Sequence, residues 1–284
     1  MNKIDFGRRI VKFDVPDHTV ELVEDELDSF KNLLMKPGFF FSLLQVIWCF
    51  FLKVDVAVTD SLNPESRGGF YFKNGFELLL PLRAVAKDAT ELPKIGNVVN
   101  INTTHRFLRK TESIDTTTDE GKSIYDGYFL SDAARRFLVR RELHRANSRR
   151  FIIVPAFAWL LMSSAVVLTF VVLLRYGRLL SYSSVLFTTP MAIVSFRDAM
   201  RRFVSYGEMM LDHDTCAESP NYVEGALQYL KSSAATNVRL RKILGDSKSE
   251  YIAANGDRIG DAWPYSKRLK SIQKFAAEEF QKQK

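Results

Sequence analysis

Two long apolar runs dominate the pattern of hydrophobic and polar positions along the chain. Residues 151–174 form a run of 24 residues without a charge, and residues 179–196 form a second run of 18. A helix rises about 1.5 Å per residue and needs about 20 apolar residues to cross the hydrocarbon core of a bilayer. A helix in a soluble core would interrupt its apolar face with charged side chains, and neither run does so. The pattern therefore predicts a transmembrane helical hairpin.

Arginine side chains crowd both outer ends of this hairpin. Arg149 and Arg150 stand before it, and Arg197, Arg201 and Arg202 follow it. Basic residues close to a membrane-spanning segment stay on the side from which the segment inserts. We therefore expect the chain on both sides of the hairpin to lie in one compartment, and we expect these arginines to attract anionic lipid.

The predicted fold class is mainly α with a small β portion, in which an integral membrane helical hairpin is inserted in an α+β soluble body. Four segments follow one another: an N-terminal region, a mixed α/β arm ending in a basic helix, the transmembrane hairpin and a helical C-terminal arm, at residues 1–65, 66–150, 151–196 and 197–284. The N-terminal region contains a short apolar segment, residues 39–52, which is too short for a membrane span and suits a buried or interfacial position.

Two strand pairs are expected in the mixed arm. The turn-forming pair Asn74-Gly75 separates residues 70–72 from residues 76–80, which predicts a β-hairpin. A second pair is predicted from residues 97–102 and residues 125–129, on either side of a polar segment.

The other elements are expected to be helices. Ser131 and Asp132 provide an N-cap for a basic helix that runs directly into the hairpin. After the hairpin, residues 196–216 continue the second membrane helix, residues 222–244 divide into two helices, and residues 266–283 form a last amphipathic helix.

The composition excludes only a few classes of function. The net charge is +7, but no nucleic-acid motif accompanies it, so nucleic acid is not an expected partner. The two cysteines, Cys49 and Cys216, are too few and too far apart to predict a disulfide framework or a zinc site. No phosphate-binding loop or nucleophile elbow is present, and no cofactor is expected.

One constellation resembles the layout of integral-membrane zinc peptidases of the Ste24 and HtpX type. In those enzymes a membrane hairpin separates an HExxH helix, whose histidines bind zinc and whose Glu activates water, from an ExxxD helix that supplies another ligand. Here Glu142 stands at the position of the HExxH glutamate, and Glu208 and Asp212 match the ExxxD pair.

The metal chemistry of that layout is missing. Arg141 and Arg145 occupy the two histidine positions, and a guanidinium stays protonated and has no lone pair for zinc. His144 is turned about 100° away from that helix face. We therefore expect no catalytic residue and no metal, and we expect Arg141 or Arg145 to pair with Glu208 or Asp212. Coincidence in a basic helix remains an alternative explanation of the layout.

A second resemblance rests on extended spacing rather than on one signature. It runs through the hairpin and through residues 130–143, 222–231, 237–245 and 251–269. On these stretches the chain resembles the transmembrane protein 177 family of the mitochondrial inner membrane. The resemblance implies a non-enzymatic, multi-pass protein with both hairpin flanks in the matrix. It also implies a role: stabilising newly made cytochrome c oxidase subunit 2, with its dedicated inner-membrane chaperone, during complex IV assembly.

Two other functions stay open at the level of the sequence. The first is a membrane-bound zinc metallopeptidase, which metal analysis of the purified protein would reveal. The second is a lipid-binding membrane scaffold, which would depend on anionic lipid without any oxidase client.

Overall fold

The computed structural model places the chain's elements in two units, and most of its described residues are helical, as predicted. One unit, here called the globular unit, comprises residues 1–147 and 211–284, and the hairpin unit comprises residues 148–210. The structure describes residues 15–34, 53–59, 63–88, 90–91, 98–105, 108–115, 118–119, 127–244, 252–259, 261 and 263–282. The apolar segment 39–52 lies outside these residues.

A three-stranded sheet forms part of the core of the globular unit. Its order is β1-β3-β2, where β1 (Val54–Thr59) runs parallel to β3 (Phe76–Pro81) and β2 (Glu65–Gly68) runs antiparallel to it. The central strand β3 is buried along most of its length, with Leu78 and Leu79 fully covered. A strand with both faces buried has no polar alternation, which explains its continuous apolar sequence.

The predicted β-hairpin is present, but its first strand was wrongly placed. The partner of β3 is β2, and residues 70–72 lie in the turn between the two strands. Gly68 and Gly75 both have positive φ, 78° and 74°, which lets the chain reverse at each end of this turn. Phe70 is only 5% exposed because it packs into the core instead of pairing in the sheet.

The second strand pair also differs from the prediction. β4 (Val98–His105) pairs antiparallel with β5 (Leu108–Asp115), which lies between the two expected strands and overlaps the predicted polar segment, residues 111–122. Of the expected partner strand, residues 127–129 form a turn, in which Gly127 has a φ of 70°. A two-residue connection brings neighbouring strands together at a smaller entropic cost than a long one. Residues 125 and 126 lie outside the described part of the chain.

The basic helix α6 (Asp132–Asn147) begins at the predicted cap. The Ser131 hydroxyl accepts a hydrogen bond from the Ala134 backbone N–H at 3.3 Å. The helix does not continue into the hairpin, because it ends at Asn147 and α7 (Arg150–Leu174) begins after Ser148 and Arg149.

α9 (Pro220–Leu244) is one continuous helix, where two were predicted. The break was expected at Ala235 and Thr236, between predicted helices at residues 223–234 and 237–245. Neither residue is glycine or proline, and alanine is a strong helix former. At the other end of α9, a Cβ on Gly225 would lie 2.2 Å from the Ala133 carbonyl oxygen, so only glycine permits this approach to α6.

Two further helices complete the globular unit. α1 (Asp17–Leu34) packs through Val23, Leu27 and Phe30, and sequence reasoning did not predict it. α10 (Tyr265–Lys282) matches the expected terminal helix and follows a turn in which Gly256 has a φ of 84°. α3 (Leu82–Val85) is a single buried turn directly after β3.

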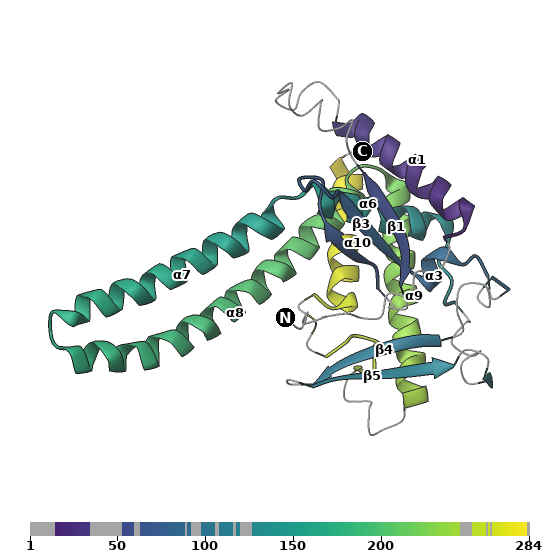
Figure 1. Cartoon of the computed structure of the whole chain (residues 1–284). Coiled ribbons are helices and arrows are strands. Elements are labelled where there is room, and N and C mark those ends of the chain that lie inside the picture. Colours follow the sequence, from purple (N-terminus) through teal and green to yellow (C-terminus); the bar gives the residue numbers. More distant parts are fainter. Residues whose placement is uncertain are drawn as a thin grey trace. The chain divides into compact units, whose positions relative to one another are not determined.

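The hairpin unit consists of α7 and the first part of α8 (Arg178–Cys216), which lie side by side (Figure 1). Both helices are long and apolar enough to cross a membrane, and almost none of their apolar windows is buried within the protein. Their large side chains face outward: Leu168 is 63% exposed and Leu186 is 74% exposed. Apolar surface of this extent is typical of a helix pair surrounded by lipid.

The close approach of α6 and α9 generates a stability prediction. We expect Gly225→Ala to destabilise the protein by about 1–3 kcal/mol, because the added methyl group collides with backbone that cannot move alone. Thermal unfolding in detergent measures the effect. Glu224→Ala, at the exposed neighbouring position, is the control and should stay within about 0.5 kcal/mol of wild type. An unchanged or higher melting temperature for Gly225→Ala would contradict the packing.

Candidate functional site

Helix α6 carries charged side chains on faces that are buried. Arg140, Arg141 and Glu142 are 2%, 4% and 1% exposed, respectively. An arginine cannot escape burial by losing its proton, so each buried guanidinium needs a charged or polar partner. The partners of Arg140 and Arg141 come from α1, from α8, from the turn before α9 and from α6 itself.

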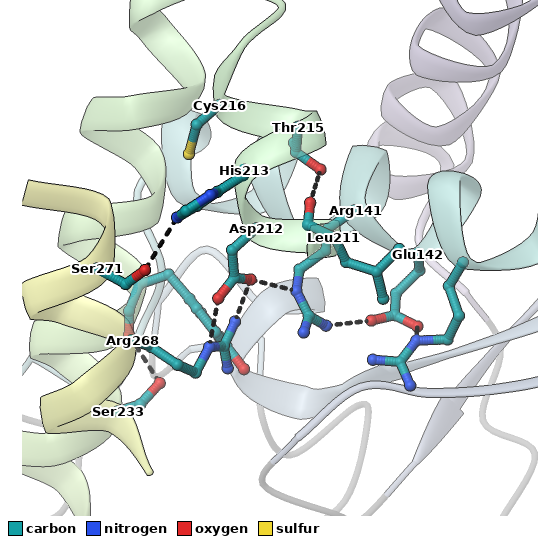
Figure 2. Close-up of polar contacts among 12 residues, drawn as sticks. Arg141, Glu142, Leu211, Asp212, His213, Thr215, Cys216, Ser233, Arg268 and Ser271 are labelled. Carbon is teal, nitrogen blue, oxygen red and sulfur yellow. Dashed lines mark hydrogen bonds and ion pairs between the residues drawn. The ribbon is translucent and has the colours of Figure 1, made fainter. Parts of the chain in front are cut away.

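Asp212 of α8 lies between two of the guanidiniums (Figure 2). Arg141 Nε donates to its Oδ1 at 2.6 Å. Arg268, from α10, donates through Nε to Oδ2 at 2.8 Å and through Nη2 to Oδ1 at 2.7 Å. This two-point contact of Arg268 is the strong geometry of an arginine–carboxylate pair. Asp212 therefore joins α6, α8 and α10.

Glu142 extends the chain of charges along α6. Its Oε1 accepts from Arg141 Nη1 at 2.8 Å, and its Oε2 lies 3.0 Å from Arg145 Nε. The order of contact is then Arg268, Asp212, Arg141, Glu142 and Arg145, so three guanidiniums meet two carboxylates. We call these five residues the buried ion network.

Burial and neighbouring charges shift the pKa values of Asp212 and Arg268 in opposite directions. Burial works to raise the pKa of Asp212, but Arg268 and Arg141 together hold that pKa below its ordinary value of 3.8. Burial works to lower the pKa of Arg268, and Asp212 raises it above the usual range. Asp212 and Arg268 are therefore both ionised at neutral pH. Burial also raises the pKa of the nearby Cys216 thiol to about 12, which leaves that thiol protonated and unreactive.

The predicted peptidase-like positions are thus partly brought together. The structure places Arg141, Glu142, Arg145 and Asp212 in one connected cluster. Glu208 belongs to the hairpin unit, and its pairing with an arginine of α6 stays a prediction. Within the described ranges, no three side chains of His, Cys, Asp or Glu are grouped so that they could hold a metal ion. Chemically, the cluster acts as an ionic crosslink between helices.

A second cluster, missed by sequence reasoning, forms around Glu218. Arg140 Nε donates to Glu218 Oε2 at 2.7 Å, and His144 contacts the other carboxylate oxygen. Burial works to raise the pKa of Glu218, but hydrogen bonds from His144 and Arg140 bring it below the ordinary value. His144, which was not expected to be a metal ligand, therefore contacts Glu218. The residues are 74 positions apart in sequence, and no local pattern joins them.

Glu26 anchors α1 to the same region. Its side chain is almost fully buried and accepts hydrogen bonds from Arg136 at 3.1 Å and from the Tyr222 hydroxyl at 2.6 Å. Arg140 Nη1 donates to the Glu26 backbone oxygen at 2.9 Å. The acidic stretch of α1 thus has a partner in the basic helix α6.

The basic residues at the hairpin ends lie in a different environment. All five are exposed, and we call them the arginine collar: Arg149, Arg150, Arg197, Arg201 and Arg202. Arg202 pairs with Asp198, one helical turn away, at 3.0 Å.

Comparisons with known proteins find no matching family model, no matching curated protein and no matching solved structure. The resemblances drawn from the sequence therefore remain expectations.

The contacts of Asp212 predict that removal of its negative charge strongly destabilises the globular unit. Asp212→Asn should destabilise the globular unit by about 3–5 kcal/mol, because Arg141 and Arg268 would stay buried and charged without their shared carboxylate. Chemical denaturation in detergent measures the loss. Asp28→Asn is the matched control: Asp28 pairs with Lys31 on the exposed face of α1 and should cost at most about 1 kcal/mol. Equal effects of the two variants would contradict the role of burial.

The same carboxylate predicts a dependence of stability on pH. Because the pKa of Asp212 is lowered on folding, its contribution is complete above its ordinary value of 3.8 and is lost as pH falls below that value through the folded pKa. The difference in unfolding free energy between wild type and Asp212→Asn should therefore be constant from about pH 5 to 7 and shrink below about pH 4. Unfolding curves of both proteins across this range test the expectation. A difference that grows on acidification would refute it.

Proposed function

We propose that the chain is a non-enzymatic, multi-pass protein of the mitochondrial inner membrane that stabilises newly made cytochrome c oxidase subunit 2 during complex IV assembly, together with the dedicated chaperone of that subunit. The globular unit and both flanks of the hairpin face the matrix. The client and the compartment come from the resemblance to the transmembrane protein 177 family, and the physical properties of the chain support the remaining parts of the proposal.

The buried ion network is the observation that carries the non-enzymatic assignment. Arg141 and Arg145 hold the positions where a zinc peptidase of similar layout has its histidines, and their guanidiniums engage Asp212 and Glu142. The carboxylate that would activate water is instead bound to two arginines and almost fully buried. A carboxylate held in this way is neither open to water nor free to accept its proton.

The exposed apolar surface of the hairpin supports a role in the membrane. A chaperone for a membrane-inserted client needs a surface that the client's own helices can contact within lipid. Helix contacts in lipid use small and polar residues, and the first helix offers Ser163, Ser164 and Ala165. A lipid-organising scaffold is the second candidate, because the exposed arginine collar suits an anionic bilayer surface.

Loss of the protein tests the proposed client. In cells without it, the steady-state amount of oxidase subunit 2 should fall severalfold while its rate of synthesis stays normal, since a chaperone protects a client after insertion. Pulse labelling followed by a chase separates the two quantities. Unchanged turnover of subunit 2 would exclude the oxidase role and leave the scaffold as the better candidate.

Rescue by Glu142→Gln separates the proposal from the peptidase alternative. Glutamine keeps a hydrogen-bond acceptor for the arginines but cannot act as a general base. The variant should therefore restore subunit 2 wherever it accumulates to the wild-type level. Failure at normal abundance, or one bound zinc ion per purified molecule, would favour the enzyme.

A further inference from the structure

Three ring contacts fix how the two helices of the hairpin are aligned. Phe151 meets Phe203 at 5.9 Å between ring centroids, Trp159 meets Phe196 at 5.3 Å, and Phe170 meets Tyr182 at 5.8 Å. The three pairs describe one antiparallel register, which Figure 1 shows as α7 running alongside α8. This register shows which residue of α7 lies at the same level along the hairpin as each arginine of α8.

The register puts charge beside the first two turns of α7. Arg197 lies at the level of Phe157, and Arg201 lies at that of Ile153. Both apolar side chains are 58% exposed. The first two turns of the apolar run of α7 therefore lie beside charged residues of α8, and only the rest of the run lies beside uncharged ones.

The stretch over which both helices are uncharged is short. It runs from the level of Trp159 and Phe196 to the turn, which is 16 residues of α7 and 18 of α8. At about 1.5 Å per residue this is roughly 24–27 Å, somewhat less than the hydrocarbon core of about 30 Å. Burying one arginine costs several times what burying one Ile, Val or Phe gains, so the arginines and not the apolar side chains set the boundary.

Aromatic residues mark both ends of this short stretch. Trp159 is 54% exposed at one end, and Tyr176 and Tyr182 are 76% and 63% exposed near the other. Trp and Tyr prefer the level of the headgroups, where the ring is apolar and its N–H or O–H stays hydrated. The aromatic positions and the arginines therefore agree on the same two boundaries.

Arg197 and Arg201 are one turn apart on α8 and project from the same face. Arg202 already has Asp198 as a partner, whereas Arg197 makes no ion pair with any described residue. A guanidinium binds phosphate oxygens through a planar fork of donors, and the apolar turns of α7 at the same level suit the first carbons of an acyl chain.

We propose that Arg197 and Arg201, with the first two turns of α7, form a headgroup site for anionic phospholipid. The hydrocarbon boundary runs at Trp159 and Phe196, so Ile153 and Phe157 lie in the headgroup layer. This inference rests on the proposed insertion of the hairpin and adds the depth, the lipid class and the residues that bind it.

Depth measurements on the full chain in nanodiscs test the boundary. Spin labels are attached to Ile153→Cys, Phe157→Cys and Val167→Cys in a Cys49→Ser background, in which the buried, protonated Cys216 does not compete. Labels at 153 and 157 should collide with a polar nickel chelate, and the label at 167 with oxygen. If all three prefer oxygen, the headgroup placement is wrong although insertion holds. If none of the three labels prefers oxygen, the hairpin is not inserted in the bilayer and the proposed membrane function is wrong.

Lipid binding tests the site. Native mass spectrometry or fluorescent-lipid competition compares phosphatidylcholine nanodiscs with discs that contain phosphatidylglycerol or cardiolipin. Arg197→Gln should weaken the preference for anionic lipid about fivefold, and Arg197→Gln/Arg201→Gln about 10- to 30-fold, because each substitution removes one charge-assisted contact between a guanidinium and a phosphate. Arg202→Gln, with the same change of charge at nearly the same level, is the matched control and should have less than a third of the effect of Arg197→Gln. Equal effects would reduce the site to general surface attraction and overturn the proposal.

Discussion

The globular unit depends on Asp212, a single buried carboxylate that two guanidiniums share. Removing an ion from water costs several kcal/mol even after the protein relaxes, and an arginine has no neutral form to fall back on. Arg141 and Arg268 can therefore be buried only where Asp212 reaches both, at 2.6 and 2.7 Å. That condition fixes α6, α8 and α10 against one another more narrowly than apolar packing alone, which tolerates small shifts of a helix.

A buried ion pair is weak evidence for stability, since well-packed apolar residues of similar size often stabilise a protein as much. Its clearer consequence is specificity, because a helix shifted by one residue would leave charges unpaired. The Glu218 cluster repeats this logic on another face of α6, where Arg140 and His144 share one carboxylate. Glu26 adds α1 to the same arrangement. The basic helix is thus held by charge on several sides, in addition to apolar residues such as Phe137, Leu138 and Leu143 that it places in the core.

The parts of the structure that depend on neighbouring residues could be predicted from the sequence. The two apolar runs, the Ser131 cap and the terminal helix each follow from composition and spacing within one segment. Pairing over long distances could not be predicted in the same way. Nothing near Asp212 indicates Arg268, which lies 56 residues later, or that β1 would pair in parallel with β3.

The errors have a common physical origin. Residues 70–72 are aromatic and suit a strand, but burial of Phe70 within a turn bounded by two glycines was more favourable than pairing. The strand β5 is polar, and its pairing with β4 depends on a short connection rather than on hydrophobicity. In both cases tertiary context overrode the local preference. The same applies to the arginines of α6, which by composition suggest a solvated face and are in fact largely buried.

The formal charge is distributed unequally between the two units. Residues 148–210 hold seven arginines and two carboxylates, so they carry +5 of the chain's formal charge of +7. The globular unit, although rich in arginine, carries only the remaining +2, because its 33 Lys and Arg residues are nearly balanced by 31 Asp and Glu residues. The basic excess therefore belongs to the ends and the turn of an apolar hairpin. An excess placed there supports the proposed insertion of the hairpin, since an anionic bilayer offers an apolar interior next to a layer of phosphate groups.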